Sequence, residues 1–206
     1  MTHIATWTHT ERTRSRWGLW GAGTAMLVLL CAAVLGGQVD VEALRRVVRV
    51  TARTSLACFL MAYMASTGAR LWPGAITQAW LTQRRQWGLL FVSSHVLHAA
   101  GIAALAVLAS PELFAQLTPL PSRVIGGLGY VAVLALALTS SDRAVVWLGR
   151  ARWQRLHSVG TQLIWLVFLL SMLKRAPASS LHAALAVLLV ACAALKAWVA
   201  VRARGR

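Results

Sequence analysis

The longest uncharged apolar stretch of the sequence restricts the fold of this chain more than any other feature. It follows the pair Arg84 and Arg85, runs to Leu108 and beyond, and is long enough to cross a bilayer, which takes about 20 helical residues. Hydrophobic residues make up 58% of the 206, and the mean hydropathy is +0.64. Both values are too high for an ordinary soluble domain. These features predict an all-α integral membrane protein.

Five further apolar segments have a comparable length, so the sequence predicts a bundle of six transmembrane helices. The predicted spans are residues 17–37, 54–72, 84–108, 123–139, 154–173 and 181–201. The expected domains are a cytoplasmic N-terminal tail, 1–16, a six-helix transmembrane domain, 17–201, and a basic C-terminal tail, 202–206.

The segments between the spans carry weaker signals. Residues 38–53 combine apolar and basic side chains at helical spacing, which predicts an amphipathic interfacial helix that leads into the second span. Residues 113–122 contain two prolines and predict a loop. In the fourth span, Gly126, Gly127 and Gly129 should let a neighbouring helix approach closely.

The charge of the chain is strongly unbalanced. Only five acidic residues face 21 Lys and Arg, which gives a net charge of +16. The basic residues lie between apolar runs, as in a membrane protein, and this placement argues against a nucleic-acid partner. Counted together with the adjoining ends of the spans, the two tails and the connections after the second and fourth spans hold two thirds of the 21. The positive-inside rule therefore predicts that both termini are cytoplasmic.

Two histidines, His95 and His98, lie one helical turn apart inside the third predicted span. An i, i+3 pair projects from one side of a helix, and ionisable side chains deep in a bilayer usually face the bundle interior and mark function. Two interpretations stay open at this point. Either both imidazoles are neutral and hydrogen-bonded to neighbouring helices, or at least one binds a metal centre, with haem iron favoured.

Three segments resemble the ferric-reductase-like transmembrane family. The third span begins RRQWGLLFVSSHVLH, similar to the RR…G…LH pattern of that family. The fifth span is entered by LTSSDRAVVWLGRARWQRLHSVG, which resembles its LTS-D…W…LG…W..LH segment, and TARTSLACFLMAYMASTG resembles its second helix. The similarity covers roughly residues 50 to 175, most of the chain.

That family includes the haem-bearing membrane subunit of the periplasmic methionine sulfoxide reductase system and the membrane core of ferric reductases and NADPH oxidases. The resemblance implies a six-helix b-type cytochrome domain that passes electrons across the membrane. In that family, paired histidines on the third and fifth helices hold two stacked haems. His98 and His157 match the two LH positions, so the resemblance implies that they bind the iron of haem b.

The chain departs from the family's pattern at two positions. Full members carry a histidine about fourteen residues before the first LH, where this chain has Arg84, and another about thirteen residues after the second, where it has Leu170. Thirteen helical residues span roughly 20 Å, so His157 cannot serve both levels. One haem is therefore expected rather than two, with a reduced ligand set for which His95 is a further candidate.

Other chemistry is not supported by the sequence. The chain has no Gly-rich phosphate loop, Walker lysine or Rossmann fingerprint, so no nucleotide-binding motif is present. The acidic residues lie outside the predicted spans, which argues against a proton-driven transporter. Any reductase activity would therefore need a separate electron donor, with this chain as the membrane component of an oxidoreductase.

Two function hypotheses follow from these observations. The first is an electron-transport subunit that carries electrons from a cytoplasmic flavoprotein or a quinol donor to an acceptor at the outer face. The second is a haem-free membrane scaffold or interaction subunit that kept the fold. Both place the chain in the lipid bilayer, with the bacterial inner membrane as the expected location.

Overall fold

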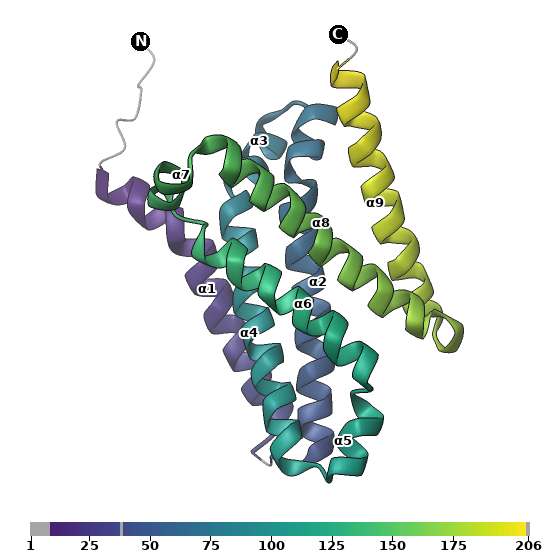
Figure 1. Ribbon diagram of the computed structural model, residues 1–206. Helices are drawn as coiled ribbons and strands as arrows, with labels where there is room; N and C mark the ends of the chain where they lie inside the picture. Colours follow the sequence, from purple (N-terminus) through teal and green to yellow (C-terminus); the bar gives the residue numbers. More distant parts are fainter. Residues whose placement is uncertain (1–8, 38, 205–206) are drawn as a thin grey trace, which may run out of the picture. The chain divides into compact units, whose positions relative to one another are not determined.

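The computed structural model describes residues 9–37 and 39–204, except for the side chains of residues 9–17 and 204. All regular secondary structure in these residues is helical (Figure 1). The elements, in chain order, are α1 (His9–Leu35), α2 (Val41–Leu71), α3 (Ala75–Thr82), α4 (Arg84–Leu108), α5 (Pro111–Leu117), α6 (Leu120–Leu138), α7 (Asp142–Leu148), α8 (Arg150–Arg175), the 3₁₀ helix η1 (Ala176–Ala178) and α9 (Ser180–Arg204).

Six of these helices are long and apolar enough to cross a membrane. They are α1 from Gly18, α2, α4, α6, α8 with η1, and α9 up to Ala203. The predicted all-α bundle of six transmembrane helices is thereby confirmed, and α4 has the predicted bounds of the third span.

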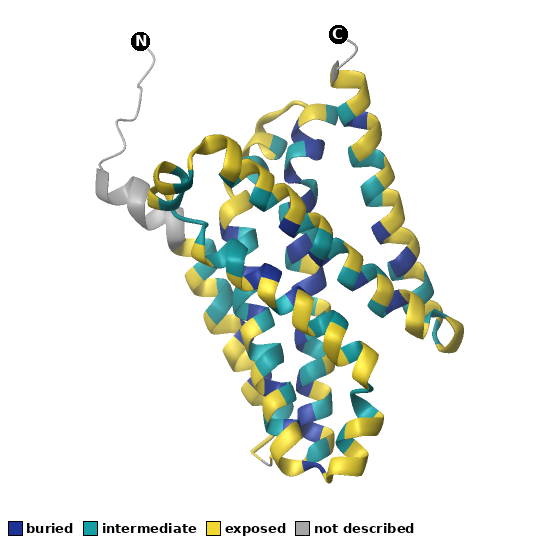
Figure 2. Ribbon diagram, in the orientation of Figure 1, coloured by how far each residue is buried: buried dark blue, intermediate teal, exposed yellow. Residues whose placement is uncertain are grey.

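The distribution of polar and apolar side chains is that of a protein in lipid. Large apolar side chains project outward from the spans, as at Val107, which is 83% exposed, and Met26, which is 73% exposed. The hydroxyl side chains of Thr51, Ser55 and Ser94 are instead completely buried. Figure 2 shows buried and exposed residues alternating along the same helices. In a bilayer, polar side chains are stabilised by facing other helices and apolar ones by facing lipid, so the chain is an integral membrane protein.

Helix α2 corrects the prediction of a separate interfacial helix before the second span. It is one continuous helix of 31 residues, because the sequence contains no glycine or proline between Val41 and Gly68 to end it. Glu42 accepts hydrogen bonds from Arg45 at 2.9 Å and from Arg49 at 2.8 Å on the exposed side. At about 1.5 Å per residue the helix is roughly 46 Å long, so this charged first part extends beyond the hydrocarbon.

The predicted loop at residues 113–122 is also wrong in part, because α5 occupies its first half. The side chain of Ser110 accepts a hydrogen bond from the backbone N–H of Leu113, and Pro111 stands at the first helical position, where its missing N–H costs nothing. Hydrogen bonds from its own backbone N–H and from Ser110 lower the pKa of Glu112. The connections after α2 and α6 likewise contain short helices, α3 and α7.

Helix α1 begins at His9, so residues 9–16 are helical, whereas the part of α1 that is apolar enough to cross a membrane begins at Gly18. Residues 1–8, with His3, lie outside the described residues, as do the last two residues of the chain.

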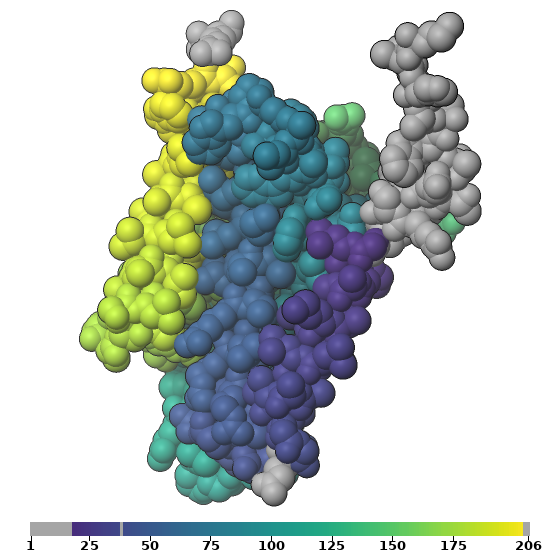
Figure 3. Space-filling view, turned by 180° about the vertical axis from the view of Figure 1, so that it is seen from behind, coloured from purple at the N-terminus to yellow at the C-terminus, as the bar shows by residue number. Residues whose placement is uncertain are grey.

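The chain forms two compact units. The first contains the chain up to Ala62 together with Ala79–Leu108, and the second contains Tyr63–Gln78 and the chain from Ala109 onward. In the first unit α1 packs against α4: the Trp20 indole N–H donates to the Ser93 hydroxyl at 3.0 Å, and a Cβ at position 23 would stand 2.5 Å from Leu90 Cδ2. Figure 3 shows the described part of α1, in purple, at the surface.

In the second unit α6 packs against α8 through small residues. A Cβ at Gly129 would lie 3.2 Å from Val167 Cγ1, and one at Gly160 would lie 2.9 Å from Leu136 Cδ2. The predicted close approach is thus found at Gly129. It is wrong for the other two glycines of the fourth span, Gly126 and Gly127, where a Cβ would meet no described atom within 4 Å.

Candidate functional site

His98 on α4 is held by α2 through one of its two ring nitrogens. Nδ1 lies 3.0 Å from the backbone oxygen of Val48 and 3.1 Å from the hydroxyl of Thr51. The Val48 carbonyl can only accept, and the Thr51 hydroxyl already donates to Val47 O at 2.8 Å. The proton of a neutral His98 therefore belongs on Nδ1, which leaves the lone pair on Nε2.

This tautomer is the one that metal-ligating histidines commonly adopt. Such a histidine donates its second ring N–H to a carbonyl or carboxylate, and that bond fixes the orientation of the ring and raises the basicity of the ligating nitrogen. His98 has both parts of this arrangement, an acceptor for Nδ1–H and a lone pair on Nε2.

A cluster of hydroxyl groups between α2 and α4 fixes the two helices beside His98. Ser94 Oγ lies 2.7 Å from Thr54 Oγ1, accepts a hydrogen bond from Ser55 Oγ at 3.0 Å and donates to Thr51 O at 3.0 Å. Because hydroxyl groups buried in a membrane protein are stabilised by partners on neighbouring helices, this cluster favours one relative placement of α2 and α4.

Gly101, one turn after His98, sets the distance between the same two helices. A Cβ at this position would lie 3.0 Å from Val48 Cγ2 and 3.7 Å from Val47 Cγ1. Only a residue without a side chain lets α4 come this close, and the closeness brings the His98 ring within hydrogen-bond distance of the Val48 carbonyl.

His95 lies beside His98 in an aromatic surrounding. Its ring centroid is 5.6 Å from that of His98 and 5.1 Å from that of Phe91, which in turn is 5.7 Å from Phe59. The predicted i, i+3 pair is therefore brought together on one side of α4.

His157 belongs to the second unit and has a different environment. Its Nε2 lies 2.9 Å from the hydroxyl of Thr139, and its ring is stacked on Trp153 with centroids 4.2 Å apart. The Thr139 hydroxyl donates to Ala135 O at 2.7 Å, and the Trp153 indole donates to Thr139 O at 2.7 Å. Thr139 is thus the acceptor for His157, whose proton belongs on Nε2. These contacts join the end of α6 to the first turns of α8.

The remaining candidate positions have fewer contacts that would suit an iron ligand. Nδ1 of His182, near the start of α9, is buried and has no hydrogen-bond partner within the described chain. Leu170, the position at which the resemblance implies a histidine, is 40% exposed. In residues 9–37 and 39–204 no three His, Cys, Asp or Glu side chains are grouped to hold a bare metal ion.

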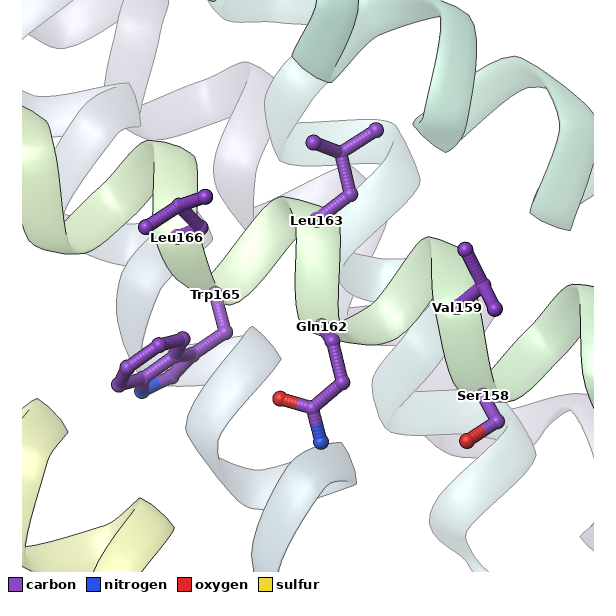
Figure 4. A pocket seen from close by; sticks show the side chains of 6 residues that line it. All are labelled: Ser158, Val159, Gln162, Leu163, Trp165 and Leu166. Carbon is purple, nitrogen blue, oxygen red and sulfur yellow. The ribbon is translucent and has the colours of Figure 1, made fainter.

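A shallow groove of about 430 Å³ runs along α8. Figure 4 shows its polar and aromatic side chains, Ser158, Gln162 and Trp165, on one side of the helix and Val159, Leu163 and Leu166 on the other. The Trp165 indole donates to Leu189 O of α9 at 3.0 Å. All six residues come from one helix, so the groove alone does not define a cofactor site.

The fold and this histidine arrangement define a class: a six-helix integral membrane protein with imidazole groups inside its bundle. Proteins from Salmonella arizonae, Salmonella paratyphi B and Salmonella newport are 31% identical to this chain over 185 or 186 residues. The matches cover 82% of this chain and 85–86% of the relatives, each named protein-methionine-sulfoxide reductase heme-binding subunit MsrQ. The chain belongs to the MsrQ family. No family model and no solved structure matches it.

Three contributors to the site were missed by the sequence analysis. Thr51 carries a weak signal, because a hydroxyl within an apolar helix usually has an interhelical partner. Thr139, the partner of His157, is part of the LTS motif but nothing in the motif indicates which residue it contacts. The Val48 carbonyl has no sequence signal, because every residue carries that group.

Proposed function

We propose that this chain is a haem-binding membrane electron-transfer subunit, a cytochrome of the ferric-reductase-like class, and that His98 is its iron ligand. The observation that carries the proposal is the hydrogen bond from His98 Nδ1 to Val48 O at 3.0 Å. It assigns the lone pair to Nε2, the nitrogen with which a histidine usually binds haem iron. The names of the Salmonella relatives, which describe them as haem-binding subunits, support the same cofactor.

Each residue around His98 has a defined task in this proposal. The Val48 carbonyl and the Thr51 hydroxyl keep the proton on Nδ1, and Gly101 keeps them within reach. The apolar lipid-facing surfaces exclude water, which favours a neutral imidazole over a charged one. When bound, the haem supplies a one-electron redox couple at this position.

The number of haems and the other ligands are also proposals. We propose one haem b, with His157 and His95 as the further histidines of a reduced ligand set. To bind iron through Nε2, His157 would have to give up its contact with Thr139 at 2.9 Å. The contacts of His98 with Val48 O and with the Thr51 hydroxyl both involve Nδ1, and we therefore propose His98 as the first ligand.

The donor and acceptor complete the proposal. The chain has no nucleotide-binding motif, so a separate cytoplasmic flavoprotein or a quinol must supply the electrons and a partner at the outer face must receive them. The charge distribution supports cytoplasmic termini in a bacterial inner membrane.

The visible absorption spectrum of the purified protein tests this function. A Soret band, with α and β bands after dithionite reduction, is expected from the wild-type protein. His98→Ala should lose most of this absorbance, whereas His182→Ala, at the start of α9, should retain it. A colourless wild-type protein that does not take up added haem would contradict the proposal and favour the haem-free scaffold.

A further inference from the structure

The first turns of α2 present four arginines on the side of the helix that is turned away from α4. This arginine face consists of Arg45, Arg46, Arg49 and Arg53. Val47, Thr51 and Ser55 are buried on the side of α2 that contacts α4. Because each helical residue advances by about 100°, the arginines lie roughly opposite to these contacts. Arg45 is partly exposed and the other three are exposed.

The positive charge of the arginine face exceeds the negative charge beside it. Glu42 forms ion pairs with Arg45 at 2.9 Å and with Arg49 at 2.8 Å. The carboxylate of Asp40 instead accepts a hydrogen bond from the backbone N–H three residues later, at 2.6 Å. Within the part of the chain that the structure describes, the other two arginines of the face have no ion pair. An anion from outside the chain can therefore bind there.

The contacts between α2 and α4, both within the first unit here, show where the arginine face lies relative to lipid. Thr51 pairs with Ser94 and Val48 packs on Gly101, so the two helices run antiparallel. Val107, six residues or about 9 Å beyond Gly101, therefore lies near the level of the first turn of α2. It is 83% exposed. An apolar side chain this exposed indicates that lipid, and not bulk water, surrounds the bundle at the level of the arginine face.

The arginine face also has the height of a headgroup layer. The first part of α2 extends beyond the hydrocarbon, and Arg46 and Arg53 are seven residues apart, which is about 10 Å along the helix. The headgroup region on each side of a bilayer is about 5–8 Å thick. Phosphate is the anion that phospholipids offer at this depth, and a guanidinium group can donate two parallel hydrogen bonds to it.

From this placement we propose that the arginine face binds the headgroup phosphate of anionic phospholipids such as phosphatidylglycerol. The arginines would contact the headgroup, and the exposed apolar side chains of α4 at the same level would contact the acyl chains. A soluble acidic protein would first have to displace the lipid around Val107 to reach this face. The proposal does not depend on haem, because His98 contacts the other side of α2.

Native mass spectrometry of the full-length protein in a neutral detergent tests the proposal. Short-chain phosphatidylglycerol and phosphatidylcholine are titrated separately, and the dissociation constant of the first bound lipid is measured for each. The wild-type protein should bind phosphatidylglycerol more tightly, because phosphatidylcholine has no net charge. Arg46→Gln combined with Arg53→Gln should weaken phosphatidylglycerol binding by about 25-fold, which is about fivefold for each arginine near a headgroup.

Two further pairs of substitutions separate this site from general attraction between charges. Arg143→Gln with Arg152→Gln removes the same charge from exposed positions of α7 and α8 and should retain wild-type binding. Arg46→Lys with Arg53→Lys keeps the charge without the paired donors and should give an intermediate affinity.

Two outcomes would overturn the proposal. In the first, the glutamine pair on α2 binds phosphatidylglycerol as tightly as the wild-type protein does, which would leave the arginine face to a soluble acidic partner. In the second, the control pair on α7 and α8 weakens binding equally, which would show that only the total charge matters. Circular dichroism of each variant shows whether it is folded.

Discussion

Gly101→Ala is the sharpest test of the packing that holds His98. The new Cβ would lie 3.0 Å from Val48 Cγ2, whereas carbon atoms in contact are ordinarily about 3.5–4.0 Å apart. Val48 is β-branched and therefore stiff at χ1, so its rotation can relieve little of this overlap. Helix α4 must then move away from α2 by a few tenths of an ångström, up to about 0.5 Å.

The expected change in the free energy of unfolding follows from that movement. A shift of about 0.5 Å would lengthen the His98 Nδ1 to Val48 O distance from 3.0 Å beyond good hydrogen-bond geometry. The lost hydrogen bond costs about 0.5–1.5 kcal/mol and the overpacking about 1–3 kcal/mol, against a gain of about 1 kcal/mol in helix propensity. The net expectation is a destabilisation of about 1–3 kcal/mol.

The assay is equilibrium unfolding by sodium dodecyl sulfate in mixed micelles, followed by far-UV circular dichroism. Gly88→Ala is the matched control, because Gly88 lies on the same helix and a Cβ there would meet no described atom within 4 Å. This control should be unchanged or more stable by up to about 1 kcal/mol. If Gly101→Ala is as stable as Gly88→Ala, the close approach of α4 to α2 is not needed to hold His98.

Three other predictions address the ligands, the missing family histidine and the topology. The Thr51→Val variant should retain haem, because the Val48 carbonyl remains as an acceptor for His98 Nδ1–H. The midpoint potential of the haem should differ from that of Thr51→Ser, because Thr51→Val removes the second acceptor of Nδ1–H. Equal potentials in the two variants would show that Thr51 does not act on His98. Leu170→His should raise the haem content and give a six-coordinate low-spin spectrum, and unchanged haem with a lower Tm would mean that side chains already fill that position. In a background without the three native cysteines, Gln116→Cys should react with an impermeant maleimide added to intact cells and Val146→Cys should not; the reverse pattern would invert the predicted orientation.

Most of the helix pattern could be predicted from the sequence, because apolar length is a local property. The bounds of α4 follow from Arg84 and from the Ser110-Pro111 pair, both of which the sequence shows directly. The amphipathic pattern of residues 38–53 was interpreted as an interfacial helix, whereas it continues into the second span as α2. The buried residues Ala43, Leu44 and Val47 follow the same helical period, so the charges mark one exposed face of a single helix.

For the candidate site, the sequence predicted only that histidines would be the ligands. The pattern located His95 and His98 on one helix face, but it could not indicate which imidazole has an acceptor for its second nitrogen. That acceptor is a backbone oxygen on another helix, fixed by the packing of Gly101 against Val48. For His157, the stacking on Trp153 and the contact with Thr139 depend on how α6 ends beside α8, which local sequence does not specify.

The backbone acceptor of His98 has a consequence for how the sequence can change. A side-chain acceptor can be deleted by one substitution, whereas the Val48 carbonyl remains whichever residue occupies position 48. The hydrogen bond therefore depends on the size of two side chains and not on their polarity. Position 101 must lack a side chain, and the side chain at position 48 must fit the space between the helices. Divergent sequences can keep the same ligand tautomer without sharing any polar residue on α2, so a search for related sites should look for a glycine three residues after the histidine.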